Sequence, residues 1–117
     1  MSLQSDFAAL AGPLAAGGAF PPGSVTTPVI PYITYFRVSG IEESTLAKNG
    51  GTDNAINTRL QIDVWATSYA QAQNIAAALK AALKNWDVEN VIQLEQDLYE
   101  SDTKLNHVAI DISCWHK

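Results

Sequence analysis

Two histidines near the C-terminus, His107 and His116, are the side chains best suited to proton transfer at neutral pH. Nucleophilic catalysis needs such a base beside a nucleophile. His107 shares a predicted strand face with Asp111, but two alternations separate them, which is too far for a direct hydrogen bond without help from another strand. His116 is nearly terminal. Surface or cross-strand contacts therefore explain both histidines better than catalysis does.

Two carboxylates, Asp63 and Asp111, fall on the polar faces of predicted strands and could form an acid–base pair. Nothing adjacent in the sequence explains how their pKa values would be driven apart. The simpler interpretation is that both are solvated or paired with Arg59. The sequence thus assigns no catalytic residue, and we expect the protein not to be an enzyme.

The other reactive groups also favour structural roles. Gly50-Gly51 lacks the glycine spacing, the following lysine and the strand-to-helix context of a phosphate loop, so we expect a turn. Cys114, the only cysteine, lies on the apolar side of the last predicted strand, where a buried thiol is expected. It has no partner for an internal disulfide, which fits a reducing compartment. Without Cys/His zinc spacing, neither metal nor cofactor is predicted.

Length and charge limit the function classes further. The 117 residues predict a single domain spanning 1–117, and 47% apolar residues with 16% charged ones predict a packed core. The formal charge is −5, and no block of Lys or Arg offers the basic surface that sequence-specific binding to nucleic acid needs. Residues 1–6 lack the basic start of a signal peptide, and the apolar stretch 7–16 is too short to span a bilayer, so no membrane association is expected.

The first half of the chain predicts one helix, an arm and one strand. Ser2 can cap a short helix that ends by Gly17-Gly18. Residues 20–31 contain four prolines and should form an extended arm. The β-branched and aromatic segment 32–38 predicts a strand that stops at Ser39-Gly40, and residues 41–54 predict a long exposed loop.

The second half carries the clearest patterns. Residues 56–66 alternate between apolar and polar types, which predicts a half-buried strand. Thr67 or Ser68 can cap the alanine-rich helix that follows. Residues 91–98 and 107–115 alternate again around a turn at Ser101-Asp102 and predict a hairpin, with Ile92, Leu94 and Leu98 on one face of its first strand. The order α-β-β-α-β-β predicts an α+β fold in which two main helices pack on an antiparallel or mixed sheet of about four strands.

One face of this sheet is a candidate contact surface. Strand parity places on its outward side five side chains of types enriched at protein interfaces: Tyr35, Arg37, Arg59, Trp65 and Trp115. The alternative is that the first helix or the proline-rich arm covers this face within the monomer. The loop 41–54, with Glu42 and Glu43, is a second candidate contact region, and a solvated connection is its alternative.

The pattern resembles a known family. A proline-rich approach leads to PYITYFRVSG, a glycine-containing loop follows, and NTRLQIDVWATSYAQAQNIAAALKAAL precedes the closing hairpin. In this order the segments resemble the tail completion or tail terminator proteins of long-tailed bacteriophages and prophages, across nearly the whole chain.

The resemblance implies a structural protein of the virion tail. Members form a ring, commonly hexameric, that caps the finished tail tube and supplies the surface joining the head connector, after assembly in the bacterial cytoplasm. It implies self-association and contacts with the tube protein and the connector, without cofactor or catalysis. A small ligand-binding or regulatory domain on the same sheet is the alternative, because a fold alone does not give function.

Overall fold

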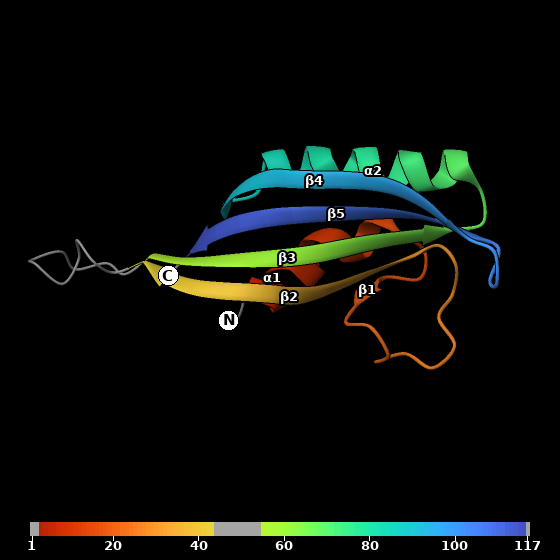
Figure 1. Cartoon of the computed structure of the whole chain (residues 1–117), viewed down its shortest axis with the longest axis horizontal. Coiled ribbons are helices and arrows are strands. Elements are labelled where there is room, and N and C mark those ends of the chain that lie inside the picture. The colour runs from red at the N-terminus through yellow and green to blue at the C-terminus, as the bar shows by residue number, and fades with distance from the viewer. Residues whose placement is uncertain (1–2, 44–54, 117) are drawn as a thin grey trace, which may run out of the picture.

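The computed structural model describes residues 3–43 and 55–116, and the side chains of residues 39–43 and 55 are left out of that description (Figure 1). The expected α+β class is confirmed, as is the expected order of the main elements. The elements are α1 (Leu3–Ala11), a 3-10 turn (Gly12–Leu14), β1 (Ala19–Phe20), β2 (Tyr32–Glu43), β3 (Ala55–Ala66), α2 (Tyr69–Lys84), β4 (Glu89–Glu100) and β5 (Leu105–His116).

The strands form a five-stranded mixed sheet in the order β1-β2-β3-β5-β4. The short β1 runs parallel to β2, and every other neighbouring pair is antiparallel. The fifth strand, absent from the sequence prediction, comes from the start of the arm, where only Ala19 and Phe20 pair with Ile33 and Thr34. Two residues are too few for a strand pattern to be seen in the sequence.

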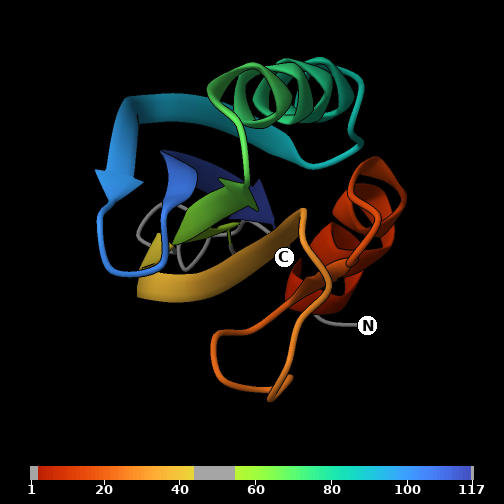
Figure 2. The ribbon, with the colours of Figure 1, turned by 90° about the vertical axis from the view of Figure 1, so that its right-hand side faces the viewer.

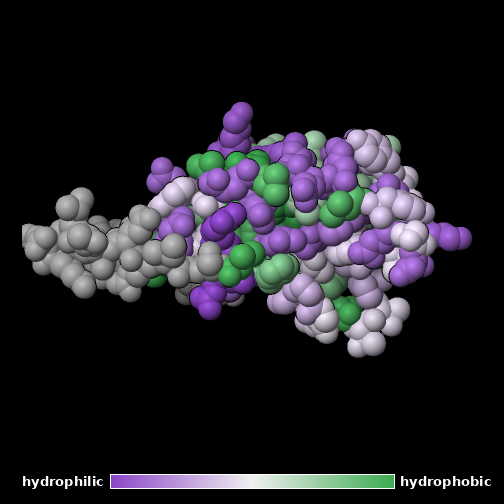
Figure 3. Space-filling model, viewed as in Figure 1, coloured by the Kyte–Doolittle hydropathy of each residue, from purple (hydrophilic) through white to green (hydrophobic). Residues whose placement is uncertain are grey.

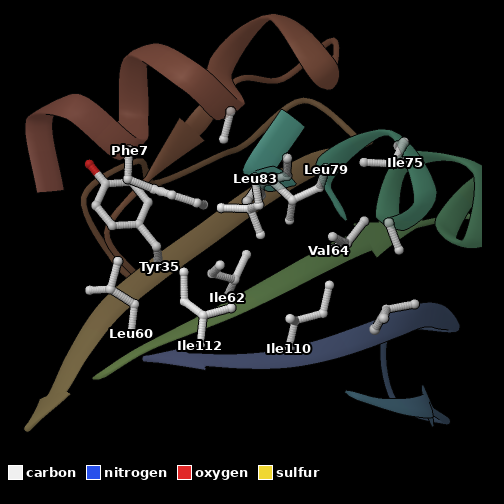
Figure 4. Close-up of a cluster of buried hydrophobic side chains, with 14 of the residues drawn as sticks. Phe7, Tyr35, Leu60, Ile62, Val64, Ile75, Leu79, Leu83, Ile110 and Ile112 are labelled. Carbon is white, nitrogen blue, oxygen red and sulfur yellow. The ribbon is translucent and has the colours of Figure 1, made fainter. Parts of the chain in front are cut away.

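Both helices lie on one side of the sheet and leave the other side open (Figure 2). Between them and the sheet lies the buried core, in which Phe7 of α1 and Leu79 and Leu83 of α2 meet the apolar side chains of β3 and β5 (Figure 4). The alternation predicted for these two strands is confirmed, since their apolar residues at alternate positions face the core. The strand residues without measurable exposure are Ile33, Leu60, Ile62, Val64, Ala66, Ile110, Ile112 and Cys114.

Helix α2 begins where the sequence predicts. The backbone N–H of Gln71 donates to the side-chain oxygen of Ser68, 3.1 Å away, so Ser68 rather than Thr67 is the capping residue. Its apolar face carries Ala72, Ala76 and Leu79, and the two alanines let the helix approach the sheet closely.

Strand β2 is longer than predicted. It continues past Ser39-Gly40 to Glu43, which pairs with Ala55 at the end of β3. Its register shifts between Arg37 and Ser39, so the serine and glycine follow a bulge rather than end the strand. Cross-strand pairing outweighs their weak strand propensity. Of the predicted loop 41–54, residues 41–43 belong to β2 and the rest, with Gly50-Gly51, lies outside the described residues.

Backbone contacts join the end of the proline-rich arm to the glycines that follow the first helix. The N–H of Gly17 donates to the carbonyl oxygen of Pro31 at 2.7 Å. A Cβ atom on Gly17 would lie 1.8 Å from the carbonyl oxygen of Val29, so no other residue fits this approach without displacement. The close approach at Gly17 therefore holds the end of the arm, at Val29 and Pro31, against the segment that follows the first helix.

Candidate functional site

The open face of the sheet, on the side away from both helices, carries polar and aromatic side chains. The register sets β3 residues directly opposite β5 residues on this face, for example Trp65 opposite His107 and Gln61 opposite Asp111. On β2 the residues of this face are Tyr32, Thr34 and Phe36, because they pair with Trp65, Asp63 and Gln61. We call the whole set the open face; its β3 and β5 members include Asn57, Arg59, Gln61, Asp63, Trp65, His107, Ala109, Asp111, Ser113 and Trp115.

An ionisable pair lies near the middle of the open face. Nε2 of His107 donates to Oδ1 of Asp63 at 2.6 Å, and the two side chains are only 11% and 8% exposed. Gln61 donates a second, longer hydrogen bond to the same carboxylate at 3.3 Å. This pair was not predicted, because spacing along one strand does not show which residue of the neighbouring strand lies opposite. The register between β3 and β5 was the necessary information.

Four rings form a row across the open face. Phe20, Tyr32, Trp65 and His107 lie with successive ring centroids 5.5, 6.0 and 3.9 Å apart, and each neighbouring pair is nearly parallel. Nε1 of Trp65 donates to Oγ1 of Thr34 at 3.2 Å. Burial, followed by the negative charge of Glu100, raises the pKa of the Tyr32 hydroxyl. The row ties β1, β2, β3 and β5 together and covers one side of the His107 imidazole.

A hollow of about 480 Å³ lies between the arm and this row of rings. Its floor includes Thr34 and Asp63, whose polar atoms are already hydrogen bonded to Trp65 and His107. The arm contributes its outer wall through Pro22, Gly23, Val25 and Pro28. The arm thus lies beside part of the open face; the alternative considered from the sequence was that the arm or the first helix covers this face.

Arg59 and Asp111 form an ion pair on the open face. Their side chains approach to 3.7 Å and are 45% and 23% exposed, so the pairing with Arg59 that was expected for these sheet carboxylates is confirmed for Asp111. Asp63 and Asp111 do not pair with each other, because each has a different partner. Trp115 is half-buried opposite Asn57 and Glu89.

The predicted face is wrong for Tyr35 and Arg37. Tyr35 pairs with Ile62 and Arg37 with Leu60, both on the helix side of the sheet. Tyr35 is buried there with its ring 5.3 Å from that of Phe7 (Figure 4). Both parities of 32–38 contain aromatic residues, so the alternation could not identify the inward face. Helix α1 therefore covers the face that carries Tyr35, not the open face that the sequence alternative assigned to it. Glu42 and Glu43 belong to β2, and their side chains are outside the described part.

The predicted face is also wrong for Ile92. Gln93 is an extra residue in β4, between Ile92, opposite Ile112, and Leu94, opposite Asp111. Ile92 therefore points to the helix side, whereas Leu94 and Leu98 belong to the open face. A bulge reverses the parity of every residue before it, and alternation along one strand cannot reveal it.

The other two residues considered for chemistry, His116 and Cys114, have structural roles. Oγ1 of Thr58 lies 2.8 Å from Nε2 of His116, which joins β3 to the end of β5. Cys114 is buried in the core as expected, and its burial raises the pKa of the thiol to about 12. A thiol held in that state at neutral pH is a poor nucleophile.

Apolar side chains stand exposed at both edges of the sheet. On β2 they are Phe36 and Val38, and on β4 they are Val91, Ile92, Leu94, Leu98 and Tyr99. The space-filling view shows apolar patches alternating with polar ones across the side that faces the viewer (Figure 3).

The family model described as tail completion protein gp17 matches residues 3–117. The chain belongs to this tail completion family. It is accordingly a structural protein of a bacteriophage tail, as the resemblance in its sequence indicated, and it works together with other components of the virion.

A solved structure has a similar fold. It is a chain of the "Virion of native gene transfer agent (GTA) particle", with a TM-score of 0.58 at 17% sequence identity, covering 97% of this chain and 87% of that one. The comparison with curated proteins found no match. Neither helix of the tail completion chain, over its described residues, is long and apolar enough to cross a membrane.

Proposed function

We propose that this tail completion protein is a single domain and that several copies of it, six by expectation, form a ring on the end of the tail tube. The ring closes the finished tube and presents the surface to which the head connector binds. Assembly takes place in the host cytoplasm before head and tail join. The observation that carries this proposal is the family match over residues 3–117.

The surface of the described residues supports a role in assembly rather than catalysis. The histidine best placed for chemistry, His107, is nearly buried between Asp63 and Trp65. Most of the exposed large apolar side chains belong to the edge strands β2 and β4, which suits contacts between proteins. We infer that the protein is not an enzyme and needs no cofactor.

A small-ligand function is less well supported. The hollow beside the arm has a suitable size, but Thr34 and Asp63, the polar groups on its floor, already have partners within the chain. A ligand there would have to displace those partners at the cost of buried hydrogen bonds. The open edges require no such exchange to receive another protein.

The test is a mass measurement in solution over a concentration series, alone and with purified tail tubes, followed by electron microscopy of the tube ends. We expect one discrete ring per tube end, together with head joining that depends on the added protein. Because rings can form on a partner surface alone, a monomer without tubes agrees with the proposal. A protein that stays monomeric and leaves tube ends bare, while authentic tails are completed under the same conditions, contradicts it.

A further inference from the structure

Strand β4 forms one edge of the sheet, and its apolar side chains remain exposed. It is 12 residues long, within the described residues it pairs with β5 alone, and its large apolar side chains are between 38% and 60% exposed. These side chains are Val91, Ile92, Leu94, Leu98 and Tyr99. A long edge strand with apolar side chains is a template for pairing with another strand unless the protein blocks it.

Among the described residues, the side-chain contacts between helix α2 and strand β4 are polar. Nζ of Lys80 is 3.0 Å from Glu95, and Gln73 and Tyr69 donate to Asp97 at 2.7 and 3.1 Å. These contacts hold β4 in place beside the helix. They leave its outer backbone edge and its apolar side chains available.

The opposite edge of the sheet is also open. Strand β1 pairs with β2 only at Ile33 and Thr34, so the outer edge of β2 from Tyr35 to Glu43 has no neighbouring strand in the described part of the chain. This stretch exposes Phe36 by 40% and Val38 by 52%. The two sheet edges thus offer matching features: unpaired backbone and exposed apolar side chains.

Charge selects which edges meet. Strand β4 contains four acidic residues and no basic one: Glu89, Glu95, Asp97 and Glu100. Two β4 strands side by side would bring like charges together, which is unfavourable. Strand β2 contains Glu42 and Glu43 at its end, but it also carries Arg37, which is exposed and belongs to none of the ion pairs formed by the described residues. A pairing of β4 with β2 therefore brings together fewer like charges than a pairing of two β4 strands, and Arg37 supplies the one opposite charge.

The proline-rich arm is a poorer candidate for the same position. Its segment 20–31 contains four prolines, each without the backbone N–H that a sheet ladder requires. Its exposed apolar residues, Val25, Val29 and Ile30, lie among these prolines, so the arm cannot offer an unbroken row of backbone N–H groups. A second copy's β2 can satisfy both the backbone and the side chains of β4.

We propose that β4 of one copy pairs antiparallel with β2 of a second copy, with Phe36 opposite Leu98 and Arg37 opposite Asp97. In this register Phe36 and Leu98 both lie on the open face, and Arg37 and Asp97 both lie on the helix side. Within one copy β2 and β4 run in opposite directions, so the sheet continues from copy to copy in its antiparallel pattern. Such head-to-tail contacts generate closed rings or open filaments.

This inference rests on the self-association in the proposed function and names the surface that performs it. The test is oxidative cross-linking of the full chain with Phe36→Cys and Leu98→Cys together, with and without tail tubes. Both positions are exposed, so the fold should tolerate the substitutions, and the buried Cys114 should not compete. We expect a ladder of cross-linked multimers that a reducing agent removes.

The matched control combines Phe36→Cys with Tyr99→Cys, one residue away on the helix side of β4, and should give at least about tenfold less product. Leu98→Cys alone reports pairing between two β4 strands. Discrete oligomers that do not cross-link, or that cross-link through Leu98→Cys alone, overturn the inference and leave the ring proposal standing. A protein that is monomeric with and without tubes overturns both.

A second variant tests the same contact without cysteines. Leu98→Lys adds a charge at an exposed position, so the unfolding midpoint should stay close to that of the wild type. The dissociation constant of the oligomer should rise at least about tenfold. An unchanged dissociation constant overturns the inference.

Discussion

The imidazole of His107 donates to the carboxylate of Asp63 across two strands at 2.6 Å, and the ring of Trp65 covers its other side at a centroid distance of 3.9 Å. A buried histidine and a buried carboxylate each satisfy the other's hydrogen-bonding need. The pair therefore belongs to the framework that holds β3 against β5, although the same residue types form catalytic sites in other proteins.

Asp63→Ala should destabilise the fold strongly. Removing one partner of a buried pair leaves the other uncompensated, and the expected loss is about 3 kcal/mol in the free energy of unfolding. Asp111→Ala is the matched control, because its partner Arg59 is exposed and the expected loss is less than about 1 kcal/mol. Urea unfolding measures both values. Equal losses of unfolding free energy in the two variants would show that the buried Asp63–His107 contact stabilises the fold no more than the exposed Arg59–Asp111 contact.

Gly17→Ala should weaken the attachment of the arm. The new Cβ would lie 1.8 Å from the Val29 carbonyl oxygen, so the arm or the preceding segment must move. We expect a loss of about 1–3 kcal/mol in thermal or urea unfolding, the usual range for overpacking. Gly12→Ala is the control, since a Cβ there meets no atom within 4 Å. A Gly17→Ala protein as stable as the control would contradict the described approach of the arm.

Trp65→Ala should affect folding before it affects assembly. The indole lies between Tyr32 and His107 and donates to Thr34, so its loss breaks the row of rings and a hydrogen bond. We expect a loss of about 2 kcal/mol or more. Trp65→Phe keeps the ring and should recover part of that loss. A Trp65→Ala protein with unchanged stability that fails to assemble would show that Trp65 contacts a partner rather than stabilising the fold.

Sequence patterns predicted those parts of the fold that depend on local periodicity. The alternation from Ile56 to Ala66 and the cap at Ser68 identified β3 and the start of α2, because both are set by neighbouring residues. The patterns failed where a distant strand decides the outcome. The bulge at Gln93, the inward face of Tyr35 and the contact between Asp63 and His107 all depend on register, which no single segment records.

Arg59→Glu should separate assembly from folding. The Arg59–Asp111 contact is exposed, so reversing the charge should cost less than about 1 kcal/mol of stability. If Arg59 meets a partner, the reversal should reduce the fraction of completed tails while the unfolding curve stays near that of the wild type. Arg59→Gln, which removes the charge without reversing it, should have a smaller effect. Normal tail completion by the Arg59→Glu protein would exclude Arg59 from the contact surface.

Stability should fall at alkaline pH in a way that depends on Cys114. Burial raises the pKa of its thiol to about 12, whereas an exposed cysteine in the unfolded chain has a pKa of about 8.5. Between these values the folded protein keeps a proton that the unfolded chain has lost, so stability decreases as pH rises through this window, by up to about 1.4 kcal/mol per unit. Stability below it is unaffected by this group.

Cys114→Ala is the control that isolates this effect, because tyrosines and lysines ionise over the same range in both proteins. The free energy of unfolding, measured between about pH 8 and 11, should fall more steeply for the wild type than for the variant. A constant offset between the curves reflects only the smaller side chain in the core. Parallel curves without convergence toward high pH would show that Cys114 ionises as readily in the folded protein as in the unfolded chain, which its complete burial should prevent.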